Sequence, residues 1–229
     1  MPKVAIVADS IACLTRELVE QHKIAIAPLP IRFGDKVYRD WVDITPSEAY
    51  KLFLKDPDSF TAAGASPGSF IDAYQQAAKR AKNILCITIS AGLSGANEAA
   101  QKAREHIKTE LPQVSIEVLD SKTATAAEGF VALAAARAAE AGKSLAEVVK
   151  AAKEIKDRVA WIAYLDTIRH LYRTGRVPKI AAQAGSLLKI KPILTMSPMT
   201  SGLIHFVGAV RNKEGGIGIQ LRRALDYRV

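Results

Sequence analysis

The sequence predicts an α/β protein of two domains, the N-terminal one with a mostly parallel sheet flanked by helices. Short apolar runs alternate with helical patterns almost from the first residue, which is typical of this fold class. Two of the runs end in the same pair of residues, at Asp9-Ser10 and at Asp120-Ser121. The chain has 229 residues, 49% of them hydrophobic, which is enough to bury a substantial core.

Strands are predicted where apolar runs lie between turn residues. They cover residues 4–8, 24–33, 36–38, 84–89, 114–119, 159–164, 190–196 and 203–210. Gly34-Asp35 predicts a hairpin within the second and third of these runs. Both Asp-Ser pairs follow a strand, and the carboxyl ends of parallel strands are where open α/β sheets bind ligands. The alternative for each pair is a cap on the next helix.

Helices are predicted from apolar periodicity and from capping residues. They cover residues 14–22, 46–54, 94–108, 126–141, 144–155, 166–172, 180–187 and 217–227, with one more beginning at Ser66-Pro67. Thr45 and Glu48 enclose a proline and form the pattern of a capping box. Residues 56–64 are expected to form a polar loop. We place the domain boundary near Asp157, which gives domains of residues 1–157 and 158–229.

Composition excludes several classes of protein. The two cysteines, Cys13 and Cys86, form no CxxC motif, and the four histidines have no paired spacing, so we expect no metal and no cofactor. Because the N-terminal run has no apolar region of signal length, we expect no secretion signal. The Ala-rich stretch 129–141 is too short for a membrane span and carries Arg137 and Glu140. These features favour a cytoplasmic protein.

The net charge is +9, and one basic cluster stands out around Gly175 and Pro178. It contains Arg169, His170, Arg173, Arg176 and Lys179. No zinc-finger spacing or RNA-binding aromatic motif accompanies it, so nucleic acid is not expected as a partner. Arg173, Arg176 and Lys179 are candidates for docking an acidic protein partner or an anionic membrane. The alternative is a solvated loop.

The stretch 86–97 is the most informative one, because an apolar strand runs into a Ser/Gly turn (residues 90–95) and then into a helix. The first amides of a helix lack partners and lie at its positive end, so such a junction binds anions. Ser90 and Ser94 add hydroxyl donors, and Gly95 allows close approach to the backbone. The alternative is that Ser94 caps the helix.

A second alternative for this turn is catalysis. Residues 92–96 differ by one residue from the G-x-S-x-G elbow of serine hydrolases, with Ala96 in the last position. Asp166 and His205 follow Ser94 in the order that such enzymes use. No oxyanion segment of the HGGG type precedes Ser94, so a hydrolase is the minor reading.

Several separated segments resemble the DegV family, the bacterial fatty-acid-binding proteins that serve fatty acid kinase in phospholipid metabolism. They include the strand end at residues 5–10, the Ser/Gly turn at 89–95 and the second Asp-Ser end at 118–121. Further matching segments are residues 28–35, 38–40, 43–46, 165–167, 175–179 and 184–194. The resemblance implies the DegV/dihydroxyacetone-kinase-like fold and a carrier without enzymatic activity of its own.

The family's carboxylate ligands are a threonine of a loop and a serine of the Ser/Gly turn, with the acyl chain buried between domains. The resemblance places Thr61 at the threonine position and Ser94 at the serine position, with Ser90 as a second candidate. The loop at 61–67 is one residue longer than the family's and lacks its Ser-Gln pair. The family's C-terminal histidine segment has no match after Arg211, so the resemblance implies a truncated or divergent C-terminal domain, shorter than usual. It also implies a fatty acid kinase as partner.

Overall fold

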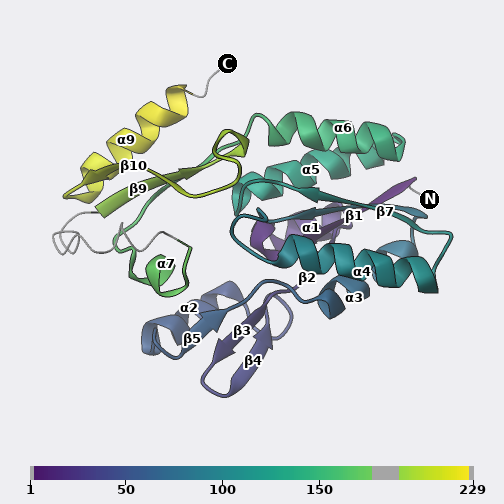
Figure 1. The fold of residues 1–229 in the computed structure, drawn as a ribbon, viewed down its shortest axis with the longest axis horizontal. Coiled ribbons are helices and arrows are strands. Elements are labelled where there is room, and N and C mark those ends of the chain that lie inside the picture. The colour runs from purple at the N-terminus through teal and green to yellow at the C-terminus, as the bar shows by residue number, and fades with distance from the viewer. Residues whose placement is uncertain (1–2, 177–190, 227–229) are drawn as a thin grey trace.

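The computed structural model describes residues 3–176 and 191–226 and contains three sheets (Figure 1). The largest is parallel, with strand order β2-β1-β6-β7. Its strands are β1 (Val4–Asp9), β2 (Ala25–Ala27), β6 (Asn83–Thr88) and β7 (Ser115–Asp120). The mostly parallel N-terminal sheet is therefore confirmed. Both Asp-Ser pairs lie at its carboxyl edge, on either side of the end of β6.

Helices cover both faces of this sheet (Figure 1). One face packs against α3 (Pro67–Ala78) and α4 (Ala96–Glu110), and the other against α5 (Ala126–Glu140) and α6 (Leu145–Lys156). The short α1 (Arg16–Gln21) joins the second face. Tyr74 is fully buried on α3, and its hydroxyl donates to Ala100 O on α4 at 3.1 Å.

Helix α5 is buried on nearly all sides because its residues are small. Ten residues of α5 are buried. Within residues 129–139, the buried residues include Gly129 and five alanines. Gly129 faces the short helix η1 (Ser10–Ala12) so closely that a Cβ atom there would lie 2.5 Å from Ala12 O. The backbone of α5 therefore lies directly against the segment that follows β1.

A small antiparallel sheet with strand order β4-β3-β5 lies beside the parallel one. It consists of β3 (Pro30–Phe33), β4 (Lys36–Arg39) and β5 (Phe60–Ala62), and α2 (Pro46–Lys55) contacts it. The predicted hairpin and the Thr45–Glu48 capping box are confirmed. The expectation of a loop throughout 56–64 is wrong, because Phe60 and Thr61 pair with Phe33 and Arg32. Pairing with a distant strand decides the structure there, and the local sequence does not show it.

The C-terminal part forms an antiparallel sheet with strand order β10-β9-β8. Its strands are β8 (Trp161–Tyr164), β9 (Lys191–Met196) and β10 (His205–Val210). η3 (Pro198–Thr200) lies between β9 and β10, and α9 (Lys213–Asp226) follows β10. α9 begins four residues before the predicted start, where the Asn212 side chain accepts from Gly215 N. The predicted helix 166–172 forms only from Arg169 to Arg173, as α7. The predicted helix 180–187 lies outside the described residues.

Residues of the predicted C-terminal domain pack into the core of the predicted N-terminal domain. Met196 is 1% exposed and belongs to the core beneath α3 and α4, and Trp161 and Ile204 pack against that core. The division at residue 157 stays a prediction. Over the described ranges, the helices include none whose length and apolar character would let it cross a bilayer.

Candidate functional site

The Ser/Gly turn connects β6 to α4 at the carboxyl edge of the parallel sheet. α4 begins at Ala96 with Gly95 as its N-cap residue, and Gly95 supplies no side-chain hydrogen bond. Ser94 precedes the cap, and its hydroxyl accepts from Ala96 N at 3.2 Å. Ser94 is thus not the N-cap residue. The positive end of a 15-residue helix opens beside it.

Both Asp-Ser pairs hold this turn by its backbone. Asp9 Oδ2 accepts from Ile89 N at 2.9 Å on one side, and Asp120 Oδ1 accepts from Ala91 N at 3.3 Å on the other. Ser90 N donates to Thr123 O at 2.8 Å. The turn is therefore fixed by both neighbouring strands, which keeps its donors in place before any ligand arrives.

A cavity of about 340 Å³, which we call the site cavity, lies against the turn. This is at the lower end of the size range of small-molecule pockets, roughly 300–1,000 Å³. Thr61, Ser94, Arg173 and Arg176 line it. Most of the other lining residues are apolar, among them Ile11, Leu29, Phe53, Phe60, Leu93 and Leu171. The structure thus brings Thr61 and Ser94 to one cavity, whereas Ser90 and Gly95 are not among its lining residues.

Gly64 and Gly95 control the space around Ser94. A Cβ atom on Gly64 would lie 2.5 Å from Ser94 Oγ, so the chain after β5 rests directly on the Ser94 side chain. A Cβ atom on Gly95 would meet nothing within 4 Å. The first turn of α4 is therefore open next to Gly95 and closed by the backbone next to Gly64.

Ser90 has a structural role. It is fully buried, its hydroxyl donates to Gly202 O at 2.6 Å, and the same oxygen accepts from Gly92 N at 3.2 Å. The Ser90 hydroxyl therefore ties the turn to the segment between η3 and β10, and its role as a second candidate ligand residue stays a prediction.

The basic cluster braces the wall of the cavity. Arg173 donates to Asp58 Oδ1 at 2.7 Å, to Pro57 O at 2.8 Å and to Phe60 O at 3.1 Å. Arg169 contacts the same Asp58 carboxylate. The Arg173 guanidinium is therefore used within the chain, and its role in docking a partner stays a prediction. Lys179 lies outside the described residues.

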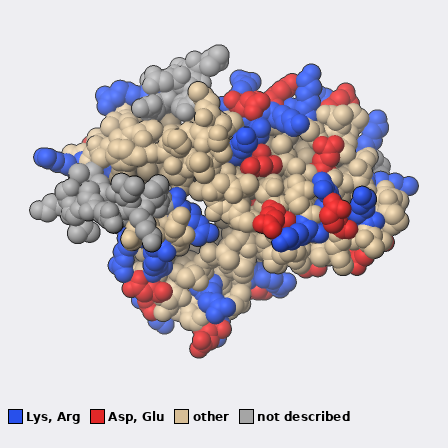
Figure 2. Space-filling model, viewed as in Figure 1, with Lys and Arg blue, Asp and Glu red and all other residues tan. Residues whose placement is uncertain are grey.

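Arg176 faces the turn. Its Nε donates to Leu93 O at 3.3 Å and its Nη1 donates to Thr174 O at 2.6 Å. The two arginines place positive charge on the rim of the cavity. Elsewhere, basic and acidic side chains are mixed over the face in view (Figure 2), so this rim is a local feature and not part of a single charged face.

The residues of the hydrolase alternative are not assembled. Asp166 accepts from Lys191 Nζ and from Tyr164 OH, and the Lys191 ammonium lowers the pKa of the Asp166 carboxyl. His205 is exposed on β10. In the part of the chain that the structure describes, no hydrogen bond joins Ser94, Asp166 and His205.

Sequence reasoning missed two residues near the turn. His170 lines the site cavity, with its ring 4.9 Å from the Phe53 ring. Glu128 is fully buried in the first turn of α5 and faces Asp9. A signal for Glu128 was present: it is an isolated carboxylate in the Ala-rich stretch, with no basic residue three or four positions away.

Burial raises the pKa of the Asp9 carboxyl to about 6, against an ordinary value of 3.8, although the Ile89 and Ile11 amides oppose the shift. Burial also raises the pKa of Glu128 well above its usual range, and the Asp9 carboxylate adds to this shift. The clusters of His, Cys, Asp and Glu in the described ranges include none able to hold a metal ion.

The raised pKa of Asp9 predicts that its contribution to stability declines with pH. Protonation favours the folded state, so the stabilisation is complete below 3.8 and is lost as the pH rises through 6. At about 1.4 kcal/mol per pKa unit the loss is about 3 kcal/mol. We expect urea denaturation between pH 4 and 7.5 to show wild type losing this much relative to Asp9→Asn as the pH rises. If the difference in the free energy of unfolding between wild type and Asp9→Asn stayed constant with pH, the prediction would be contradicted. The exposed Asp35→Asn should follow wild type.

The sequence of this chain is similar to those of one protein family. The sequence pattern of the uncharacterised DegV protein family matches residues 3–218. A DegV domain-containing protein of Caldanaerobacter subterraneus subsp. tengcongensis is 33% identical over 227 residues, which cover 99% of this chain and 77% of that protein.

Solved structures show the same fold. A stearic acid-binding protein from Eubacterium ventriosum superposes with a TM-score of 0.85 at 28% identity, covering 99% of this chain and 76% of the other. DegV, a fatty acid binding protein from Bacillus subtilis, gives 0.84 at 28% identity, covering 99% and 78%. The fatty acid kinase B3 protein from Streptococcus pneumoniae, loaded with linoleic acid, gives 0.82 over 98% and 78%; at 22% identity it indicates the fold alone.

Proposed function

Because this chain belongs to the DegV family, we propose that it binds a long-chain fatty acid without forming a covalent bond. The carboxylate binds at Ser94 and Thr61, beside the first turn of α4, and the acyl chain is buried between the two predicted domains. One observation carries the proposal: the two hydroxyl residues implied by the resemblance line the same largely apolar cavity. Two relatives of the same fold and 28% identity are fatty-acid-binding proteins.

The two ends of the ligand have different tasks. About fourteen methylenes, each worth about 0.8 kcal/mol on leaving water, contribute about 11 kcal/mol before ordering costs. Hydrogen bonds to a charged carboxylate contribute about 1.5–3 kcal/mol each. The acyl chain therefore supplies most of the affinity, and the polar residues decide which end of the ligand stands at the turn. Arg173 and Arg176 favour an anion there.

A carrier of this kind presents the carboxylate to a separate ATP-dependent kinase. The sequence contains no Walker A motif or kinase glycine loop, so phosphoryl transfer is assigned to the partner. Arg173, Arg176 and Lys179 are the candidates for docking the kinase, although Arg173 and Arg176 also donate hydrogen bonds within the chain.

Natively purified protein is expected to release a long-chain acid on organic extraction, detected by mass spectrometry. Ser94→Ala and Thr61→Val should each weaken palmitate binding by roughly 10- to 100-fold, because each removes a hydrogen bond to a charged group. Ser115→Ala and Thr109→Val change the same residue types at exposed positions on β7 and α4 and should bind like wild type.

Two outcomes would contradict the carrier. One is a protein that yields no long-chain acid and takes none up on incubation. The other is turnover of an aryl ester that Ser94→Ala abolishes, which would favour the hydrolase instead.

A further inference from the structure

Two buried carboxyl groups, Asp9 and Glu128, face each other behind the Ser/Gly turn. Asp9 is 1% exposed and Glu128 is 0% exposed, and Asp9 also lines the site cavity. The titratable groups that act most strongly on the pair come from four other elements and are thiols and carboxyls, while Arg173 and Arg176 line the same cavity as Asp9. The thiols and carboxyls are Cys86 on β6, Cys13 after η1, Asp40 after β4 and Asp120 at the end of β7.

Two carboxylates buried beside each other in a low-dielectric interior do not both stay ionised at neutral pH. Glu128 is the one that keeps its proton, because neither of its oxygens accepts an ordinary hydrogen bond from the described residues. Asp9 is the better anion, since the Ile11 and Ile89 amides donate to it at 3.0 and 2.9 Å. The pair therefore holds one proton and one negative charge.

The negative charge is connected to the ligand site through the backbone. Ile89, whose amide Asp9 accepts, directly precedes Ser90 and the rest of the turn. A shift of the Asp9 carboxylate would shift the start of the segment that carries Ser94. Asp9 thus acts on the site in two ways: it positions the turn, and it places a charge on the cavity wall.

We propose that Asp9 and Glu128 position the Ser/Gly turn and take up a proton when an anionic headgroup binds there. The inference rests on the proposed function for the placement of the headgroup at Ser94. A bound anion adds negative charge near Asp9 and so favours its neutral form. Neutral Asp9 keeps its carbonyl oxygen as acceptor for Ile89 N, so the turn stays in place. By linkage, affinity for an anion then rises as pH falls.

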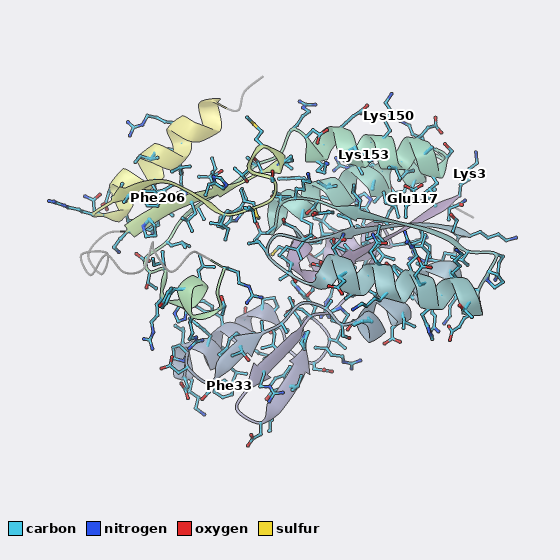
Figure 3. All side chains as sticks on the ribbon, viewed as in Figure 1. Lys3, Phe33, Glu117, Lys150, Lys153 and Phe206 are labelled. Atoms are coloured by element: carbon cyan, nitrogen blue, oxygen red, sulfur yellow. The ribbon has the colours of Figure 1, made fainter. Side chains whose placement is uncertain are left out.

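Hexadecanesulfonate is a suitable probe because its headgroup stays ionised between pH 6 and 8, so any pH dependence belongs to the protein. Wild type should bind it about three- to tenfold more tightly at pH 6 than at pH 8. Asp9→Asn fixes as neutral the side chain that takes up the proton, keeps an oxygen to accept from Ile89 N, and should reduce the ratio to less than about twofold. Glu117→Gln, which removes a carboxylate at an exposed position on β7 (Figure 3), should keep the wild-type ratio.

Calorimetric titration of wild type at pH 7 in two buffers of different ionisation enthalpy counts the protons directly, and it does not depend on the folding of a variant. Palmitate and hexadecanesulfonate are both titrated. Uptake of a fraction of a proton per ligand supports the proposal, and no uptake overturns it.

Other results separate the two proposals. His170 lines the same cavity and would act in the same direction if it were protonated. A pH dependence of binding that persists in Asp9→Asn but disappears in His170→Gln would overturn the role of the carboxyl pair. Binding with a flat pH profile in wild type would overturn this inference alone. Failure of wild type to bind palmitate or hexadecanesulfonate at any pH would overturn the carrier function as well.

Discussion

Gly64→Ala is expected to weaken palmitate binding by roughly 10- to 100-fold, the equivalent of one hydrogen bond to a charged group, while the protein stays folded. The added methyl group would lie 2.5 Å from Ser94 Oγ and 3.4 Å from Ala96 N. The first contact is not tolerable, but the hydroxyl is the end of a short side chain and can rotate away. The substitution therefore removes the Ser94 donor from the cavity without removing the residue.

A titration with palmitate measures this loss, and urea denaturation measures the free energy of unfolding, which should change by less than about 1 kcal/mol. Gly68→Ala, on the next helix, would meet only Ser66 Oγ at 3.6 Å and should bind like wild type. Unchanged palmitate affinity in a folded Gly64→Ala protein would show that the Ser94 hydroxyl does not contribute at this position.

Gly202→Ala is expected to lower the free energy of unfolding by about 2–5 kcal/mol. Gly202 has a φ of +74°, and a Cβ atom there would lie 2.3 Å from Ser90 Oγ and 3.0 Å from Lys122 Cα. The methyl group would thus add left-handed strain and push apart two buried segments. It would also break the hydrogen bond from Ser90 to Gly202 O, leaving the buried Ser90 hydroxyl without its acceptor.

Gly208→Ala is the matched control, because it adds the same methyl group on β10 with nothing within 4 Å. Denaturation midpoints for both variants, together with the free energies of unfolding, give the comparison. Equal losses in the free energy of unfolding for Gly202→Ala and Gly208→Ala would show that the close contact of Gly202 with Ser90 and Lys122 does not limit the residue at position 202.

What the sequence could predict was local. The Thr45 and Ser144 capping boxes, the Gly34-Asp35 hairpin and the parallel sheet follow from neighbouring residues and from the order of elements. β5 was missed because its partner, β3, lies about thirty residues away, and patterns among neighbouring residues do not show such a pairing. The start of α9 was misplaced because the Asn212 side chain supplies an N-terminal hydrogen bond ahead of the apolar pattern.

The predictions about the site also divide into those that depend on neighbouring residues and those that depend on distant ones. Ser94 was predicted because a strand, a Ser/Gly turn and a helix in this order are typical of an anion site, and Thr61 because the family resemblance implies a threonine there. The structure places both on one cavity. Ser90 shares the same turn and residue type, yet its hydroxyl donates to Gly202 O, 112 residues later. Arg173 was read as a free basic residue, but Asp58 lies 115 residues before it. Only packing between distant segments distinguishes a ligand contact from a structural one.

The close packing of α5 has a consequence for which mutations this protein can accept. Gly129 rests on Ala12 O, and η1 follows directly from Asp9, which in turn holds Ile89. A methyl group added at Gly129 would press on Ala12, and the displacement would pass through η1 and Asp9 to Ile89, next to the Ser/Gly turn. This would happen although α5 covers the opposite face of the sheet from α4. A substitution at Gly129 is therefore expected to disturb the Ser/Gly turn, although none of the residues that line the site cavity belongs to α5.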